Sequence, residues 1–137
     1  MPDLGDVAES IEHALAGGEP DRGAEIAEVD FKSVSELTGA CRGGSCVISA
    51  LCGLREVIVG TQRLLLDAAV KAGVPRFIPS DFSIDFTKLS PGTNRNLELR
   101  REFHERLDKA PIAATSILNG MFTHLLTGEA PFILFKL

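Results

Sequence analysis

The sequence of 137 residues contains no tryptophan, no tyrosine and no long apolar run. Because a membrane-spanning helix needs about 18 consecutive apolar residues, no membrane span is predicted. Residues 1–15 carry four acidic side chains and no basic one, which is the wrong charge for a secretory signal peptide. These absences lead to the expectation of a cytoplasmic protein.

Cysteine is scarce as well, with Cys41, Cys46 and Cys52 and no C-x-x-C pair. The histidines lie far from them in sequence, so we expect no metal site and three reduced thiols in or near the core. The net charge of -5 makes attraction to nucleic acid or to an anionic membrane unexpected.

Periodicity and capping signals predict helices and strands in strict alternation. Such alternation with short loops predicts an α/β protein with a parallel sheet and right-handed crossovers. The expected helices are 7–17, 33 to about 41, 55–72, 91 to about 109 and 121–126, and the expected strands are 24–29, 45–51, 76–80, 112–118 and 130–137.

Local signals set several of these boundaries. Ser33 followed by Glu36 forms a capping box, and Gly73 suits the end of the helix 55–72. Ser90 and Pro91 look like an N-cap followed by proline at the first helical position. The nearly continuous apolar run 45–51 indicates a strand buried on both faces.

Three stretches together resemble the NmrA-like and isoflavone-reductase-like proteins: "CVISAL", "LLDAAVKAGVPRFIPSDF" and "IAATSILNGMF". These proteins are atypical short-chain dehydrogenases/reductases with a Rossmann fold that binds NADP(H). The resemblance covers about residues 24–137, and "AGVPRFIPSDF" is its most specific part. It implies that residues 1–137 form one partial NAD(P)-binding Rossmann domain, a doubly wound parallel sheet flanked by helices and truncated at both ends.

The resemblance also implies a dinucleotide site at the carboxyl ends of the strands, where open α/β sheets bind ligands. Residues expected near the nicotinamide are Pro79, Ser80, Asp81, Phe82 and Asn119; those expected on the adenosine side are Asp30, Phe31, Ser49, Ala50 and Leu51. Read from the residues alone, Ser80 and Asp81 could instead cap the local backbone at a strand exit. Asn119 could likewise serve only to stabilise a turn.

The glycine-rich phosphate loop of the family, G-x-x-G-x-x-G, is absent from this sequence, and so is the family's second strand. We therefore expect binding of NADP(H) or NAD(H) to be weak or absent in this chain alone. Without the family's first two strands, the edge of the strand 45–51 either stays open or pairs with the strand 24–29, which moves across to it. Unpaired backbone groups at a buried edge cost about 1–3 kcal/mol each, so marginal stability or self-association through exposed sheet edges is expected.

Catalysis would depart from the family pattern. The missing tyrosine excludes a Tyr-x-x-x-Lys dyad, and Arg100 stands closest to the position of the lysine used by the isoflavone-reductase branch. Arginine stays protonated and cannot transfer that proton, although it could bind an anion or polarise a carbonyl. His104 is the second candidate, with a solvent-exposed histidine as the alternative. Lys88 could reach a phosphate or substrate, or could be a surface lysine.

Three functions remain open at this point. The full-length protein could be an NAD(P)H-dependent oxidoreductase of the atypical short-chain dehydrogenase type, reducing a small aromatic or carbonyl-bearing substrate. It could be a non-catalytic dinucleotide sensor that controls a regulatory partner. The 137 residues could also be an inactive truncated product. Both functional readings imply a dinucleotide partner, and the first adds a small-molecule substrate.

Overall fold

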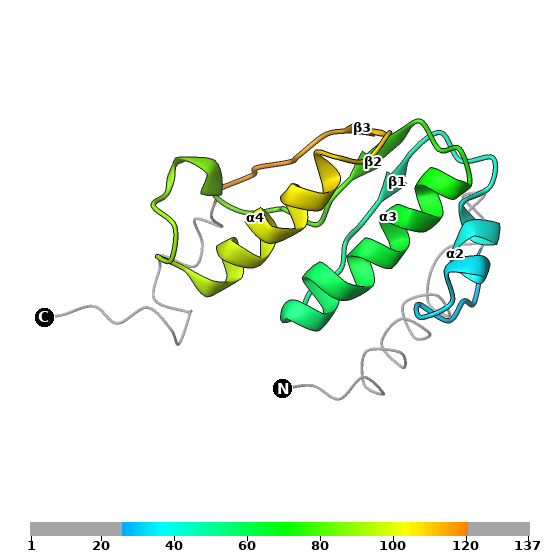
Figure 1. Cartoon of the computed structure of the whole chain (residues 1–137), viewed down its shortest axis with the longest axis horizontal. Coiled ribbons are helices and arrows are strands. Elements are labelled where there is room, and N and C mark those ends of the chain that lie inside the picture. Colours follow the sequence, from blue (N-terminus) through cyan, green and yellow to red (C-terminus); the bar gives the residue numbers. More distant parts are fainter. Residues whose placement is uncertain (1–25, 121–137) are drawn as a thin grey trace, which may run out of the picture.

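A computed structural model describes residues 26–120 of the chain. Its centre is a three-stranded sheet in the order β1-β2-β3 (Figure 1). The strands are β1 (Val47–Ile48), β2 (Arg76–Ile78) and β3 (Ala113–Ala114), and both neighbouring pairs are parallel. The predicted α/β class with a parallel sheet is therefore confirmed.

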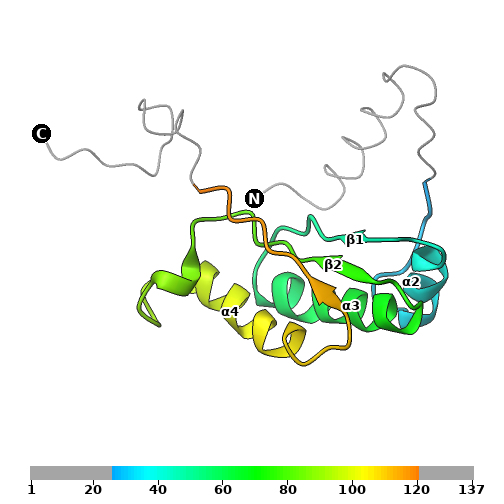
Figure 2. The same ribbon diagram turned by 90° about the horizontal axis from the view of Figure 1, so that it is seen from above.

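Helices connect the strands in the predicted order. They are α2 (Val34–Cys41), the π-helix η1 (Glu56–Thr61) that continues into α3 (Gln62–Lys71), the short 3-10 helix η2 (Phe86–Lys88) and α4 (Arg95–Leu107). The α3 and α4 helices lie side by side on one face of the sheet (Figure 2). Each connects two parallel strands, as a crossover helix must.

The hydrophobic core lies between the sheet and these two helices. Phe77 from β2 is fully buried and its ring lies 6.2 Å from the ring of Phe103 on α4. The core cluster consists of Leu66, Ala69, Val74, Phe77, Phe103 and Leu107. Because most of these side chains come from α3 and α4, the two helices are anchored to the sheet and to each other.

The capping signals are confirmed at two of three places. The Ser33 side chain accepts a hydrogen bond from the backbone N–H of Glu36, which begins α2. Gly73 follows α3 with φ of 74°, a left-handed conformation that glycine adopts without steric cost. The predicted start at Ser90-Pro91 is wrong: α4 begins after Asn94, whose side chain accepts from the backbone of Asn96 and Leu97.

Two strand predictions need correction. Residues 26–29 form no strand. Among residues 26–120, no segment therefore pairs with the outer edge of β1. The segment 45–51 is also not buried on both faces, because the Ile48 side chain is 62% exposed. The described helices cover one face of the sheet only, so the other face of β1 lacks packing partners among these residues. The elements predicted at 7–17, 121–126 and 130–137 lie outside the described residues.

None of the helices in the described part of the chain combines the length and apolar character needed to cross a membrane.

Candidate functional site at the carboxyl edge of the sheet

Polar side chains follow the strands at the edge where the strands end. Ser49 comes directly after β1, Ser80 and Asp81 follow β2, and Ser116 follows β3. The strands are parallel, so these positions meet at one edge of the sheet, beside α4. Ser49, Ser80 and Asp81 are buried, at 1%, 5% and 1% exposure, which is unusual for such residues.

The exit from β2 is fixed by a buried glutamine. The Gln62 side chain accepts a hydrogen bond from the backbone N–H of Ser80 at 2.7 Å and donates one to the Ile58 carbonyl at 3.1 Å. Ile58 lies in the π-helix, where the wider turn changes the usual backbone pairing. The Ser80 hydroxyl donates to the Leu51 carbonyl at 2.5 Å, so the loops after β1 and β2 are tied together.

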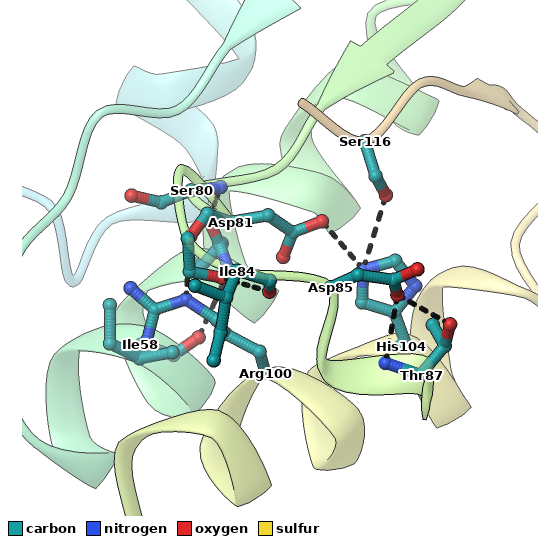
Figure 3. Close-up of polar contacts among 11 residues, drawn as sticks. Ile58, Ser80, Asp81, Ile84, Asp85, Thr87, Arg100, His104 and Ser116 are labelled. Atoms are coloured by element: carbon teal, nitrogen blue, oxygen red, sulfur yellow. Dashed lines mark hydrogen bonds and ion pairs between the residues drawn. The ribbon is translucent and has the colours of Figure 1, made fainter. Parts of the chain in front are cut away.

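Asp81 and His104 form a partly buried pair (Figure 3). The Nε2 atom of His104 lies 2.9 Å from Oδ2 of Asp81, and the His104 side chain is 21% exposed. The hydrogen bond to the Asp81 carboxylate raises the pKa of His104 and outweighs the opposing effect of burial. The hydroxyl of Ser116 lies 3.5 Å from the same nitrogen, at the outer limit of hydrogen bonding.

The histidine ring is also held by apolar contacts. Phe86 of η2 meets it edge-on at 5.4 Å between ring centres, and Phe103 does so at 6.5 Å. His104 is therefore a fixed component of the carboxyl edge. The alternative of a solvent-exposed histidine on a charged helix is wrong.

Two arginines of α4 hold the loop that follows Asp81. The Nε atom of Arg100 donates to the Asp81 carbonyl at 2.7 Å, and its Nη1 donates to the Asn96 carbonyl at 2.9 Å. Arg101 donates to the carbonyls of Phe86 and Leu89. Within this loop Phe82 has φ of 23°, which is uncommon for a residue with a side chain and marks a locally strained turn.

Two buried polar atoms at this edge have no hydrogen-bond partner among the described residues: Oγ of Ser49 and Oδ1 of Asp81. Leaving such an atom unpaired costs about 1–3 kcal/mol, and more where the group is charged. Both atoms follow strands at the carboxyl edge, so they suit an additional polar ligand. A dinucleotide bound at this edge would be expected to offer hydrogen-bonding groups to these two atoms.

The structure brings together part of the predicted site. Contacts join Leu51 to Ser80 and join Asp81 to Arg100 and His104, and Pro79 is buried between these loops. Ala50, Phe82 and Asn119 are exposed residues in the segments after β1, β2 and β3. The N–H of Gly120 donates to the Ser83 carbonyl at 3.1 Å, which joins the last two of these segments.

Asp30 and Phe31, which are predicted to lie on the adenosine side, stand just before α2 and make other contacts. The Asp30 carboxylate accepts from the N–H of Lys32 at 2.8 Å, and the Asp30 N–H donates to Glu36. Phe31 is 43% exposed and lines an apolar pocket of about 300 Å³ with residues of α2, β1 and α3. No hydrogen bond of the described residues joins Asp30 or Phe31 to the edge after β2.

Lys88 pairs with Asp85 at 3.1 Å and is 82% exposed, as expected for a surface lysine. The three cysteines are unpaired thiols, and burial raises the pKa of Cys41. Residues 26–120 contain no group of three or more histidine, cysteine, aspartate or glutamate side chains arranged to hold a metal ion.

Sequence reasoning missed two residues of this edge. Gln62 carries a usable signal, because it is a polar residue four positions from both Ile58 and Leu66 on the buried face of its helix. Ser116 carries none, since a serine late in an apolar strand has no distinguishing spacing. Its proximity to His104 depends on the path of the segment after β3, which the local sequence does not indicate.

Comparison with known proteins finds a matching family and a similar protein. The model of the NmrA-like family matches residues 9–125. A protein of Arthroderma benhamiae, "Oxidoreductase swnN", is 34% identical over an alignment that covers 83% of this chain and 39% of that protein.

Two solved structures are similar in fold. One, "AtPrR2 with NADP+ and (+)pinoresinol", has a TM-score of 0.73 at 26% identity and covers 93% of this chain and 42% of its own. The other, "AtPrR2 in apo form", has a TM-score of 0.63 at 26% identity, with 89% and 39% covered. The parallel sheet with its helices thus matches the Rossmann-like fold of these structures. The chain spans about two fifths of the length of the relatives that it matches.

Proposed function

This chain belongs to the NmrA-like family, and from that premise we propose that it is part of an NAD(P)-binding Rossmann domain whose full-length protein reduces a small aromatic or carbonyl-bearing molecule. The family membership and its oxidoreductase relative support the reaction class. One observation on this chain supports the location of the binding site. The buried atoms Ser49 Oγ and Asp81 Oδ1, both at the carboxyl edge of the sheet, have no hydrogen-bond partner among the described residues.

The residues of this edge fit a dinucleotide in part. Ser80, Asp81 and Asn119 would hold the nicotinamide end, where amide and hydroxyl groups can pair with polar side chains and N–H groups. Ser49, Ala50 and Leu51 would face the adenosine side, and Asp30 and Phe31 would complete it. The bound dinucleotide would supply a hydride for reduction. The sequence offers no glycine-rich loop for the pyrophosphate, so the affinity of this chain is expected to be low.

The test is a titration of the purified chain with NADPH and with NADH, followed by melting temperature and by calorimetry. A ligand that binds only the folded state stabilises it by about 2.7 kcal/mol at a hundredfold excess over Kd. We expect a concentration-dependent rise for one or both dinucleotides. A cooperative melt that ignores both would contradict binding by these 137 residues.

A matched pair of variants locates the ligand. Asn119→Ala changes an exposed residue after β3, at the carboxyl edge, and should weaken binding several-fold without altering the melt of the free chain. Lys109→Ala changes an exposed residue just after α4, where the chain turns toward the amino end of β3, and should leave the Kd unchanged. Equal effects of both variants would contradict a site at the carboxyl edge.

A non-catalytic sensor is the second candidate, and the geometry of Arg100 favours it. Two carbonyls of the surrounding backbone already accept hydrogen bonds from the Arg100 guanidinium, which cannot transfer a proton. Such a protein would bind the dinucleotide and consume none with any substrate. An absorbance assay of NADPH loss over a panel of aromatic aldehydes and ketones separates the two candidates.

A further inference from the structure

The turn that leaves β2 at Asp81 is attached to α4 by two side chains (Figure 3). The Nε atom of Arg100 donates to the Asp81 carbonyl at 2.7 Å, and His104, one helical turn further along, contacts the Asp81 carboxylate at 2.9 Å. Guanidinium stays charged at every accessible pH, whereas imidazole gains and loses a proton near neutral pH. Of these two attachments, only the one made by His104 therefore responds to pH.

The Asp81 carboxylate has one titratable partner. Its side chain is 1% exposed, and its Oδ1 atom has no hydrogen-bond partner among the described residues. The other oxygen, Oδ2, is paired with Nε2 of His104. A neutral imidazole can keep this hydrogen bond through its N–H, but it no longer supplies the positive charge that offsets a buried negative one. Loss of the proton from His104 therefore weakens the attachment of the turn.

The charged groups around the imidazole act in one direction. Asp81 faces it from the exit of β2, and Asp108 acts from the end of α4; both favour the charged ring and raise its pKa. Arg100 has a fixed charge and donates to the backbone. From η2, Asp85 and Lys88 pair with each other at 3.1 Å. The ring is thus charged for as long as the pH stays below a raised midpoint.

The other neighbours of the ring do not titrate near neutral pH. Phe86 of η2 and Phe103 of α4 meet it edge-on, and the Ser116 hydroxyl after β3 lies 3.5 Å from Nε2. These contacts hold the ring in place whether it is charged or neutral. A change of pH therefore alters the charge of the pair without displacing the imidazole from the turn.

The backbone of the same turn is strained. Phe82 has φ of 23°, a conformation that a residue with a side chain keeps only where its surroundings fix it. The next residue, Ser83, accepts a hydrogen bond from the N–H of Gly120 at 3.1 Å, so the turn also holds the segment after β3. A strained turn of this kind opens when one of the contacts that fix it is weakened.

We propose that His104 controls the turn 81–83 through its protonation state: the charged ring holds the turn closed, and loss of the proton lets it open. Opening separates Ser83 from Gly120 at the carboxyl edge of the sheet. Residues 86–89 stay in place, because Arg101 holds their carbonyls at every pH. This regulation goes beyond the proposed function and does not rest on it, although residues of the same turn are those proposed above for the nicotinamide end.

Hydrogen exchange of single amides, followed by NMR on the full chain, tests the proposal. The N–H of Asp81 bonds within the turn at 2.8 Å and that of Gly120 bonds to Ser83, so both amides report on the closed turn. The N–H of Gly44, which is hydrogen-bonded in an exposed turn after α2, is the control. Each exchange rate is divided by the intrinsic rate at the same pH, which gives the protection of that amide.

We expect the protection of Asp81 and Gly120 to fall as pH rises from about 6.5 through the midpoint of His104, because a raised pKa stabilises the closed turn below that window and ceases to do so above it. Linkage fixes the size of the effect. The total fall is about tenfold for each unit by which the His104 midpoint, read from its imidazole resonances in the same samples, exceeds about 6.5. Gly44 and Leu89 should keep their protection.

Three variants assign the effect to the pair. His104→Gln keeps a hydrogen-bonding side chain without a charge, so the protection of both reporter amides should be low and flat with pH. Asp81→Asn removes the buried charge and should also remove the pH dependence. Glu105→Gln, which changes an exposed charge on the same helix, should match the unaltered chain. The titration of the unaltered chain decides the question even where Asp81→Asn fails to fold.

Constant protection of Asp81 and Gly120 across the His104 midpoint would overturn the proposal, and so would the absence of protection below it. An equal fall at Gly44 would show that the whole chain loosens and that the turn does not open by itself. A fall that persists in His104→Gln would assign the pH dependence to another group. None of these outcomes requires NADPH, so the dinucleotide titration tests the proposed function separately.

Discussion

The two faces of the sheet differ sharply in what covers them. On the helical face, Phe77 is completely buried against Phe103 and Leu66. On the other face, the Ile48 side chain of β1 is 62% exposed. The same strands therefore carry one packed and one uncovered surface within the described residues.

This difference shows where the stability of the chain resides. Burial of apolar area contributes about 25 cal/mol per Å², so the helical face supplies nearly all of the hydrophobic stabilisation seen here. The polar edge is fixed to that packed side, because Gln62, Arg100 and His104 all come from α3 or α4. The candidate site thus depends on the covered face and owes little to the open one.

The largest effect is expected from Phe77→Ala on the packed face. Deleting a buried phenylalanine ring costs about 3–5 kcal/mol, which is much of the stability of a small domain. Urea unfolding followed by circular dichroism should show a large drop in midpoint or no folded baseline. A midpoint within error of the unaltered chain would contradict the packed face as the main source of stability.

A smaller loss is expected from Gln62→Leu, which removes the buried link between α3 and the β2 exit. The N–H of Ser80 would lose its partner, at a cost of about 1–3 kcal/mol. The control is Arg63→Gln, an exposed neighbour on the same helix, for which no change is expected in the same urea experiment. Equal midpoints for the two variants would show that the Gln62 hydrogen bonds do not stabilise the exit from β2.

The third prediction concerns pH. The folded pKa of His104 is raised, so its pair with Asp81 stabilises the fold fully below the unfolded value of about 6.5. That stabilisation is lost as pH rises from about 6.5 through the folded pKa. Urea midpoints measured across this window should fall more for the unaltered chain than for His104→Gln. Parallel pH curves would contradict a stabilising ionic pair.

The smallest effect on stability is expected from Ile48→Lys on the open face. A surface substitution of this kind changes the free energy of unfolding by about 0.5 kcal/mol or less. The added charge at an uncovered strand should oppose edge-to-edge pairing, so sedimentation velocity should show less self-association. An unchanged distribution in a chain that does associate would place the contact elsewhere.

Parts of the site were predictable because they depend on local order. Ser80 and Asp81 follow an apolar strand, and the carboxyl end of a parallel strand is a position that sequence can identify. The start of α2 at Ser33 and the glycine after α3 are likewise local. Asn94 was missed because Ser90 and Pro91 offer the same signal four and three residues earlier, and the path of the loop held by Arg101 decides between them.

By itself the sequence determined the alternation of helices and strands, the parallel sheet and the polar residues at its carboxyl edge, because periodicity, caps and turns act over a few neighbouring positions. Only the tertiary structure decided that His104 faces Asp81, that Gln62 reaches Ser80 and that Ile48 stays exposed. These contacts join residues 18 and 23 positions apart, or depend on which face the helices cover. Their geometry is set by packing between elements, which no local pattern encodes.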